Sequence, residues 1–134
     1  MTGLDTNILI RYMLRDDPGQ SPRAEKLMEQ LTESDPGFIS AVVVVETAWV
    51  LELVYKFADH EIAAAIERML QIDVLVVEHR LEVYLAIAAL KQRQGHFADA
   101  LIGAISRRAG CRRILTFDRK ASRLPGFKLL QTEQ

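Results

Sequence analysis

Residues 37–57 read GFISAVVVVETAWVLELVYKF, and this stretch decides the fold class of the chain. A short strand is predicted over residues 38–40, directly after a Pro-Gly turn. The apolar run that follows is longer than a strand, so residues 41–56 are predicted to form a helix despite four consecutive valines. A helix that is apolar on nearly every side must be covered all round, by the core or by a second copy of the chain.

The change from strand to helix recurs on both sides of this stretch. Residues 74–77 are all apolar, which predicts a fully buried strand there. Such alternation is typical of an α/β protein, a three-layer α/β/α sandwich with a mostly parallel central sheet. At 134 residues, the chain is predicted to form one domain over residues 1–134. Strands are predicted over residues 2–5, 38–40, 73–78, 113–117 and 127–130, and helices over residues 8–14, 41–56, 60–71, 81–94 and 97–109, with a further helix capped by Ser21.

The composition excludes several classes of protein. Hydrophobic residues make up 49% of the chain and charged residues 26%, which is typical of a folded protein rather than a disordered one. The single cysteine, Cys111, excludes an internal disulfide and a cysteine-based zinc site, and it fits a cytoplasmic protein. No signal peptide is expected, and no membrane association, because no apolar run reaches the roughly 18 residues that a membrane span requires.

Charged residues are unevenly distributed along the chain. Residues 107–128 carry a net charge of +7, whereas the rest of the chain carries −8. A basic segment on an acidic body is suited to a polyanion such as RNA. The charge pattern leaves an alternative equally open, in which these are solvated helix and loop charges. The candidates for contacts with an RNA backbone are Arg112, Arg113, Arg119 and Lys120.

Four acidic residues occupy comparable places in the predicted elements. Asp5 ends the first strand, and Asp118 directly follows the strand over residues 113–117. Glu46 and Asp99 lie within the first two turns of helices. Regular right-handed crossovers would bring the carboxyl ends of all strands to one edge of the sheet. The four carboxylates are therefore predicted to converge at that edge.

Clustered carboxylates repel one another unless a positive charge joins them. Ligand sets made only of oxygen favour hard divalent ions, so one or two Mg²⁺ or Mn²⁺ ions are expected. Metal ions held in this way suit phosphoryl chemistry, because they bind phosphate oxygens and lower the pKa of a bound water. The acidic set thus predicts a metal-dependent enzyme that acts on phosphate esters.

Each acid also has a structural explanation. Asp5 is a common type of helix cap, and Asp99 complements the positive end of its helix. Asp118 could simply belong to a turn. Glu46 is harder to explain, because it interrupts an otherwise apolar helix and lies six residues after Ser40, too far for a capping box. A polar group in such surroundings requires a partner.

At these residues the sequence resembles the PIN-domain family, and within it the VapC-type toxins of bacterial toxin–antitoxin pairs. The resemblance spans nearly the whole chain, and each motif is weak alone but the ordered set is specific. In order, the motifs are GLDTNILIR at 3–11, SAVVVVE at 40–46, FADALI at 97–102, and LTFDR at 115–119 followed by LPGF at 124–127.

The resemblance implies a function that spacing alone does not. PIN domains are single-strand-directed ribonucleases with Mg²⁺ or Mn²⁺ at their acidic cluster, which implies an endoribonuclease acting as the toxin of a type II toxin–antitoxin system. Asp5, Glu46, Asp99 and Asp118 would then bind the metal, with Thr6, Asn7 and Thr116 as supporting polar groups. The resemblance also implies a homodimer and an antitoxin protein that blocks the site, often with a basic side chain.

Two other functions remain open at the level of the residues. One is a Mg²⁺-dependent phosphatase or phospho-acceptor with Asp5 as its nucleophile. The motif Asp5-Thr6-Asn7 lacks the second aspartate of haloacid-dehalogenase-like phosphatases, which counts against this reading. The other is a non-catalytic module whose acidic groove receives a basic peptide. Such a module need not bind Mn²⁺, so a metal titration separates it from an enzyme.

Overall fold

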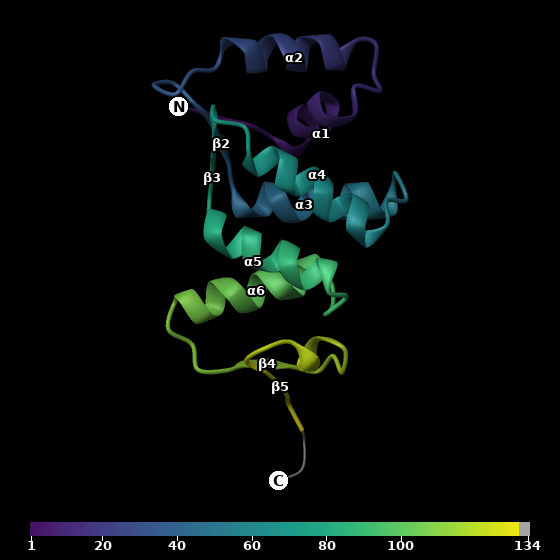
Figure 1. The fold of residues 1–134 in the computed structure, drawn as a ribbon, viewed down its shortest axis with the longest axis vertical. Helices are drawn as coiled ribbons and strands as arrows, with labels where there is room; N and C mark the ends of the chain where they lie inside the picture. The colour runs from purple at the N-terminus through teal and green to yellow at the C-terminus, as the bar shows by residue number, and fades with distance from the viewer. Residues whose placement is uncertain (132–134) are drawn as a thin grey trace. The chain divides into compact units, whose positions relative to one another are not determined.

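The computed structural model describes residues 1–131, and the chain divides into two compact units, Met1–Glu78 and His79–Gln134. Both units are of the α/β type, with helices and parallel strands (Figure 1). Each predicted strand and helix is present, with ends shifted by a few residues. The fold class predicted from the alternation of strands and helices is therefore confirmed. No helix within residues 1–131 is long and apolar enough to cross a membrane.

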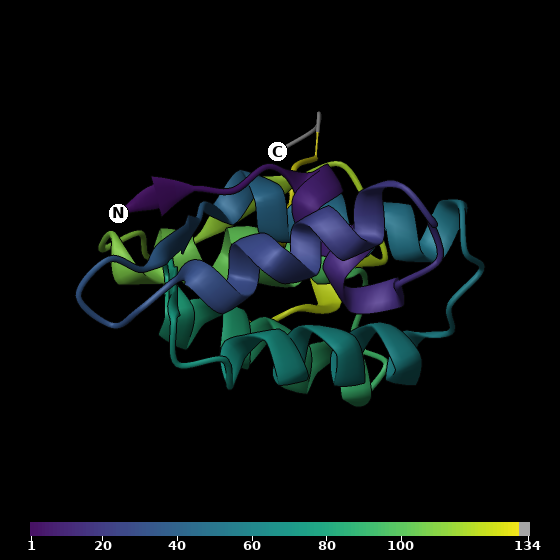
Figure 2. The ribbon, with the colours of Figure 1, turned by 90° about the horizontal axis from the view of Figure 1, so that it is seen from above.

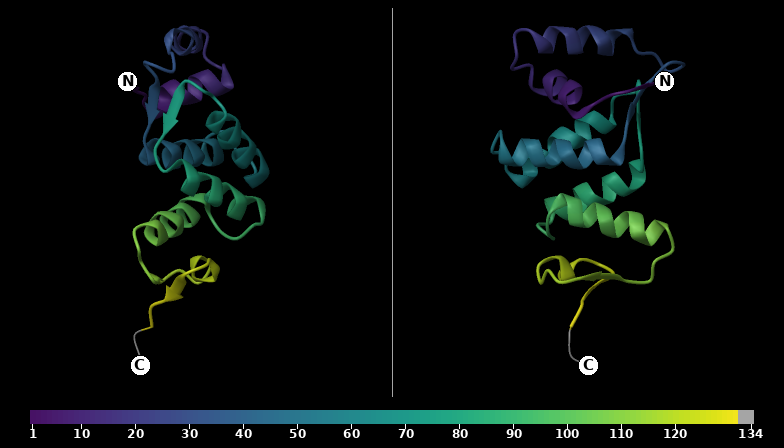
Figure 3. Two further views of the ribbon diagram at one scale, coloured as in Figure 1. Left: turned by 60° about the vertical axis from the view of Figure 1, so that its left-hand side comes forward. Right: turned by 180° about the vertical axis from the view of Figure 1, so that it is seen from behind.

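The amino-terminal unit contains a sheet of three short parallel strands. These are β1 (Thr2–Gly3), β2 (Gly37–Ile39) and β3 (Leu75–Val77), in the order β1-β2-β3. Figure 3 shows β2 and β3 side by side. Because all three strands run in the same direction, the residues that follow them lie at one edge of the sheet. Val76 is 44% exposed, so the expectation that the third strand is fully buried is wrong.

Four helices accompany this sheet: α1 (Thr6–Leu14), α2 (Gln20–Gln30), α3 (Ala41–Leu53) and α4 (Asp59–Leu70). Helix α1 packs against α2 and α3, and α3 packs against α4 (Figure 2). The core of the unit is aliphatic, as expected where burial of apolar surface drives folding. Its most deeply buried side chains include Leu9, Ile39, Val44, Leu51, Ile62, Ile66, Met69 and Leu70.

Helix α2 begins differently from the prediction. Ser21 is not its cap, because the helix already starts at Gln20 and Ser21 is buried, donating a hydrogen bond to the carbonyl of Arg11 at 2.8 Å. The carboxylate of Asp17 takes the capping role. Its Oδ1 accepts hydrogen bonds from the backbone N–H groups of Gly19, at 2.9 Å, and Gln20, at 2.7 Å.

The long apolar segment forms a helix, as predicted, and two side chains satisfy its first N–H groups. Ser40 Oγ accepts from the N–H of Val43 at 3.2 Å, and Glu78 Oε1 accepts from that of Ala41 at 2.8 Å. Within a single chain the helix is not covered all round, and its covering by a second copy stays a prediction. Apolar side chains exposed on α3 are Val42, Trp49 and Leu53.

The carboxy-terminal unit pairs two helices with a small sheet. Helices α5 (Arg80–Lys91) and α6 (Phe97–Arg108) pack against each other, and β4 (Ile114–Thr116) pairs in parallel with β5 (Phe127–Leu129). A single turn of 3-10 helix, η1 (Ala121–Arg123), connects the strands and was not predicted. Gly110 follows the end of α6 with a φ of +101°, a conformation that glycine adopts without strain.

Candidate metal centre

Asp5 follows β1 and caps α1. Its Oδ1 accepts a hydrogen bond from the backbone N–H of Thr6 at 2.9 Å, and its carbonyl accepts from Ile8 and Leu9. The capping function considered for this residue is therefore present. Oδ2 receives no hydrogen bond from the described residues, and the side chain is exposed. One oxygen of Asp5 thus stabilises the helix while the other is available to a ligand.

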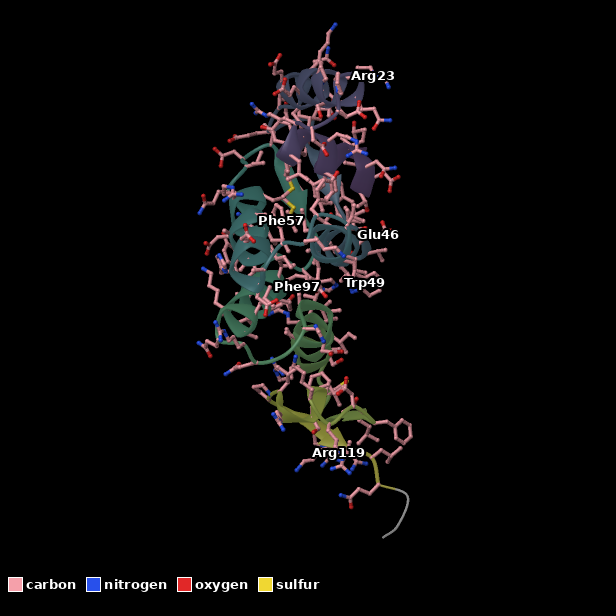
Figure 4. The ribbon with its side chains drawn as sticks, turned by 90° about the vertical axis from the view of Figure 1, so that its right-hand side faces the viewer. Arg23, Glu46, Trp49, Phe57, Phe97 and Arg119 are labelled. Atoms are coloured by element: carbon pink, nitrogen blue, oxygen red, sulfur yellow. The ribbon has the colours of Figure 1, made fainter. Side chains whose placement is uncertain are left out.

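Glu46 is held by the residue that directly follows Asp5. The hydroxyl of Thr6 is buried and donates a hydrogen bond to Oε1 of Glu46, which links α1 to α3 across forty residues of sequence. Glu46 is exposed, and Figure 4 shows it at the outer edge of α3. Thr6 is therefore the polar partner that was expected for Glu46 on its apolar helix. This contact brings the first and second acidic motifs together at the carboxyl edge of the three-stranded sheet.

Glu78 also lies at this edge, directly after β3, and was not among the predicted site residues. Its Oε1 is already occupied by the N–H of Ala41, so Glu78 acts as a cap for α3. Asn7 is exposed on α1, and its side chain makes no hydrogen bond within the described residues. It lines a groove between α1 and α2.

Asp99 and Asp118 belong to the carboxy-terminal unit. Asp99 is half-buried in the first turn of α6, where the positive end of the helix dipole favours its charge. Asp118 follows β4 and organises the next turn. Its Oδ1 accepts from the N–H groups of Lys120 at 2.8 Å and Ala121 at 3.3 Å, and its own N–H donates to Thr116 Oγ1 at 3.0 Å. Thr116 and Asp118 are thus brought together, and Asp118 Oδ2 receives no hydrogen bond from the described residues.

Two of the four acids therefore belong to each unit. Within residues 1–131, no three or more His, Cys, Asp or Glu side chains form a group that could hold a metal ion. The convergence of all four acids stays a prediction. The donor set itself suits a hard cation, since Asp5 and Asp118 each keep a free carboxylate oxygen and every donor is an oxygen.

The four basic residues predicted to contact RNA are all exposed. They lie before β4 and between β4 and η1, and Figure 4 labels Arg119 among them. Their placement is compatible both with contacts to a polyanion and with solvated surface charges, so the RNA contact remains a prediction.

Arg11 is a cation held in place by side-chain hydrogen bonds, and it was not among the predicted site residues. Its Nε donates to Gln20 Oε1 at 2.9 Å, and its Nη1 donates to Tyr55 Oη at 3.0 Å and lies 3.4 Å from Asp16 Oδ1. The hydrogen bond with Tyr55 raises the pKa of Arg11. Its position four residues after Asn7, a candidate supporting group at the start of the helix predicted over residues 8–14, was the signal that could have identified it.

Comparison with known proteins identifies the family of the chain. The model of the PIN domain family matches residues 4–126, a span that contains all four acids. A VapC ribonuclease of Aquifex aeolicus (strain VF5) is 27% identical over 126 residues, which cover 93% of this chain and 92% of that protein. Because the family model matches nearly the whole chain, including parts of both units, this chain belongs to the PIN domain family.

Proposed function

We propose that this protein is a Mg²⁺- or Mn²⁺-dependent endoribonuclease and the toxin of a type II toxin–antitoxin pair. The observation that carries the proposal is the hydrogen bond from Thr6 to Glu46, which ties the first two acidic motifs together within a PIN-family chain. The similarity to a VapC ribonuclease supports RNA as the substrate. We further propose that residues 1–134 act as one nuclease domain in the cytoplasm.

The metal ligands in this proposal are Asp5, Glu46, Asp99 and Asp118. A divalent cation bound there would neutralise phosphate oxygens and lower the pKa of the attacking water. Asp5 and Asp118 fit the role because one oxygen of each anchors its position through backbone N–H groups and the other is free. Thr6 fixes the orientation of Glu46, as groups that hydrogen-bond to a metal ligand usually do. Asn7 and Thr116 are the other proposed supporting polar groups.

The reaction is hydrolysis of a phosphodiester bond in RNA. Glu46 would bind a second ion or position the attacking water. The water oxygen bonds to phosphorus and gives its proton to the solvent, and the bond from phosphorus to the leaving oxygen breaks as that oxygen takes a proton from the solvent. Exposed cations hold the backbone of the strand without reading its bases. Those cations are Arg112, Arg113, Arg119 and Lys120.

The proposed partners follow from the same resemblance. An antitoxin protein would block the acidic site with a basic side chain. A homodimer is supported by the exposed apolar side chains of α3, where Val42 is 73% and Leu53 is 63% exposed. Exposed apolar groups that gather on one element are typical of a surface that another chain covers.

The deciding experiment compares Asp5→Asn and Asp99→Asn with the unaltered protein in Mn²⁺-dependent cleavage of single-stranded RNA. Both variants should lose cleavage, because an amide cannot supply the negative charge that holds the cation. Asparagine still caps a helix, so Asp5→Asn should keep its circular dichroism spectrum and thermal midpoint. Asp59→Asn, in the first turn of α4, is the matched control and should cleave normally. Full cleavage by Asp5→Asn or Asp99→Asn would reject the assignment.

A further inference from the structure

A groove of about 330 Å³ lies between α1 and α2 in the amino-terminal unit. Its walls carry two guanidinium groups and two amides, which can bind an anion and its neighbouring polar groups. The residues that line it are Asn7, Ile8, Arg11, Gln20, Arg23 and Ala24. The mechanism proposed above uses neither arginine.

The two arginines are presented to the groove in different ways. Arg11 is held by Gln20 and Tyr55, and its side chain is 28% exposed, so its charge is fixed in place and remains accessible. Arg23 is exposed on α2, where Figure 4 labels it. Its side chain makes no hydrogen bond or ion pair within the described residues, and it attracts Asp17 over a longer distance.

Nearby acids offset part of these charges. Asp16 Oδ1 lies 3.4 Å from Arg11 Nη1, while its Oδ2 accepts a hydrogen bond from Tyr55 at 2.8 Å. Asp17 is bound to the backbone at the start of α2 and attracts both arginines. Neither carboxylate lines the groove, and Arg23 forms no ion pair within the described residues, so its charge is the less compensated of the two.

The groove begins beside the candidate metal ligands. Asn7 follows Asp5 and Thr6 on the first turn of α1, and Arg11 lies one helical turn further along the same helix. A strand of RNA whose phosphate reaches Asp5 therefore meets a cationic surface within two turns of α1. Such a surface is needed, because a site built of carboxylates repels the phosphates on either side of the one that it cleaves.

We propose that the α1–α2 groove binds the phosphate backbone of the RNA strand next to the bond that is cut. This inference rests on the ribonuclease function proposed above. Arg11 and Arg23 provide charge-assisted hydrogen bonds to phosphate oxygens, and Asn7 and Gln20 provide amide groups for the sugar. Charge complementarity favours RNA over a basic peptide, which the two arginines would repel.

The test uses Arg23→Gln, which removes the charge but keeps a long polar side chain in an exposed position. It is made in the full chain carrying Asp99→Asn, so that the RNA stays intact during titration. The probe is a short fluorescein-labelled single-stranded RNA of mixed sequence, measured by fluorescence anisotropy over a range of salt concentrations. Arg68→Gln, an exposed arginine on α4, is the matched control.

Arg23→Gln should weaken RNA binding about tenfold, the usual effect of losing one charge-assisted hydrogen bond. It should also lower the slope of log affinity against log salt by about 0.7, as expected for one lost phosphate contact on a single strand. In the otherwise unaltered protein, the same substitution should raise KM for RNA cleavage and leave kcat unchanged. Arg68→Gln should change none of these values.

Equal RNA affinity and salt slope for Arg23→Gln and Arg68→Gln would overturn the groove assignment while leaving the ribonuclease function intact. If Arg23→Gln instead weakens binding of a glutamate-rich peptide and leaves RNA affinity unchanged, the groove is a protein-docking surface and the proposal is wrong. Absence of Mn²⁺-dependent cleavage by the unaltered protein would contradict the ribonuclease function itself, so the two failures are distinguishable.

Discussion

The hydroxyl group of Thr6 determines the orientation of one proposed metal ligand, Glu46. It is buried at the start of α1, and its hydrogen bond orients Glu46 from a different helix. Valine has nearly the same shape as threonine but cannot donate this hydrogen bond. The orientation of Glu46 is therefore sensitive to a substitution of Thr6 that removes the hydroxyl group and changes the volume little.

Thr6→Val should lower the rate of Mn²⁺-dependent cleavage and the affinity for Mn²⁺ by about 10- to 100-fold, the usual cost of losing a group that orients a metal ligand. Thr6→Ser keeps the hydroxyl and should restore most of both values. Cleavage kinetics and calorimetric titration with Mn²⁺ measure the effect. Unchanged Mn²⁺ affinity in Thr6→Val would show that the contact with Glu46 is only structural.

At the scale of elements, the start of α2 depends on one carboxylate. The backbone N–H of Gln20, and after it that of Gly19, lowers the pKa of Asp17. A carboxyl whose pKa is lower in the folded state stabilises the fold above its unfolded pKa of roughly 3.9, and this contribution is lost as pH falls through the folded pKa.

Asp17→Asn should therefore have a lower thermal midpoint than the unaltered protein at pH 7, because asparagine caps the helix without a charge. The difference should shrink as the pH falls from about 4, the unfolded pKa, through the lower pKa at which the folded protein protonates Asp17. Circular dichroism melts across a pH series measure this difference. Asp73→Asn, in the turn before β3, controls for the loss of one surface charge. A difference in midpoint that stays constant down to the lowest pH would contradict the role of Asp17.

At the scale of the whole molecule, the proposed metal ligands come from both units, two from each. A cation that binds only the folded state raises its stability in proportion to the logarithm of the cation concentration. If the four acids act together, then losing an acid from either unit should abolish this stabilisation.

Mn²⁺ at about 100 times its dissociation constant should stabilise the unaltered protein by roughly 2.7 kcal/mol. Removing it with EDTA should reverse the shift in thermal midpoint. Glu46→Gln and Asp118→Asn, one from each unit, should each show little or no shift with Mn²⁺. A full shift in Asp118→Asn with none in Glu46→Gln would place the metal on the amino-terminal acids alone.

The sequence by itself determined the kinds of elements and the places of the acids. Periodicity and length identified the helix after β2 in spite of its valines, because these signals are local. The positions of Asp5 and Asp118 at strand ends, and of Asp99 in a first turn, followed from the same local pattern. The capping groups were partly predictable, since Asp5 is a cap but Ser21 is not.

Only the tertiary structure decided which faces of the elements meet. It paired Thr6 with Glu46 and Arg11 with Tyr55, contacts that span forty or more residues and leave no periodic signal. It also seated the ring of Phe127 against Gly103, where an added Cβ would stand 2.6 Å from a ring carbon. Helix caps and periodicity act within a few residues, whereas such contacts depend on how helices and strands pack, which no short stretch of sequence encodes.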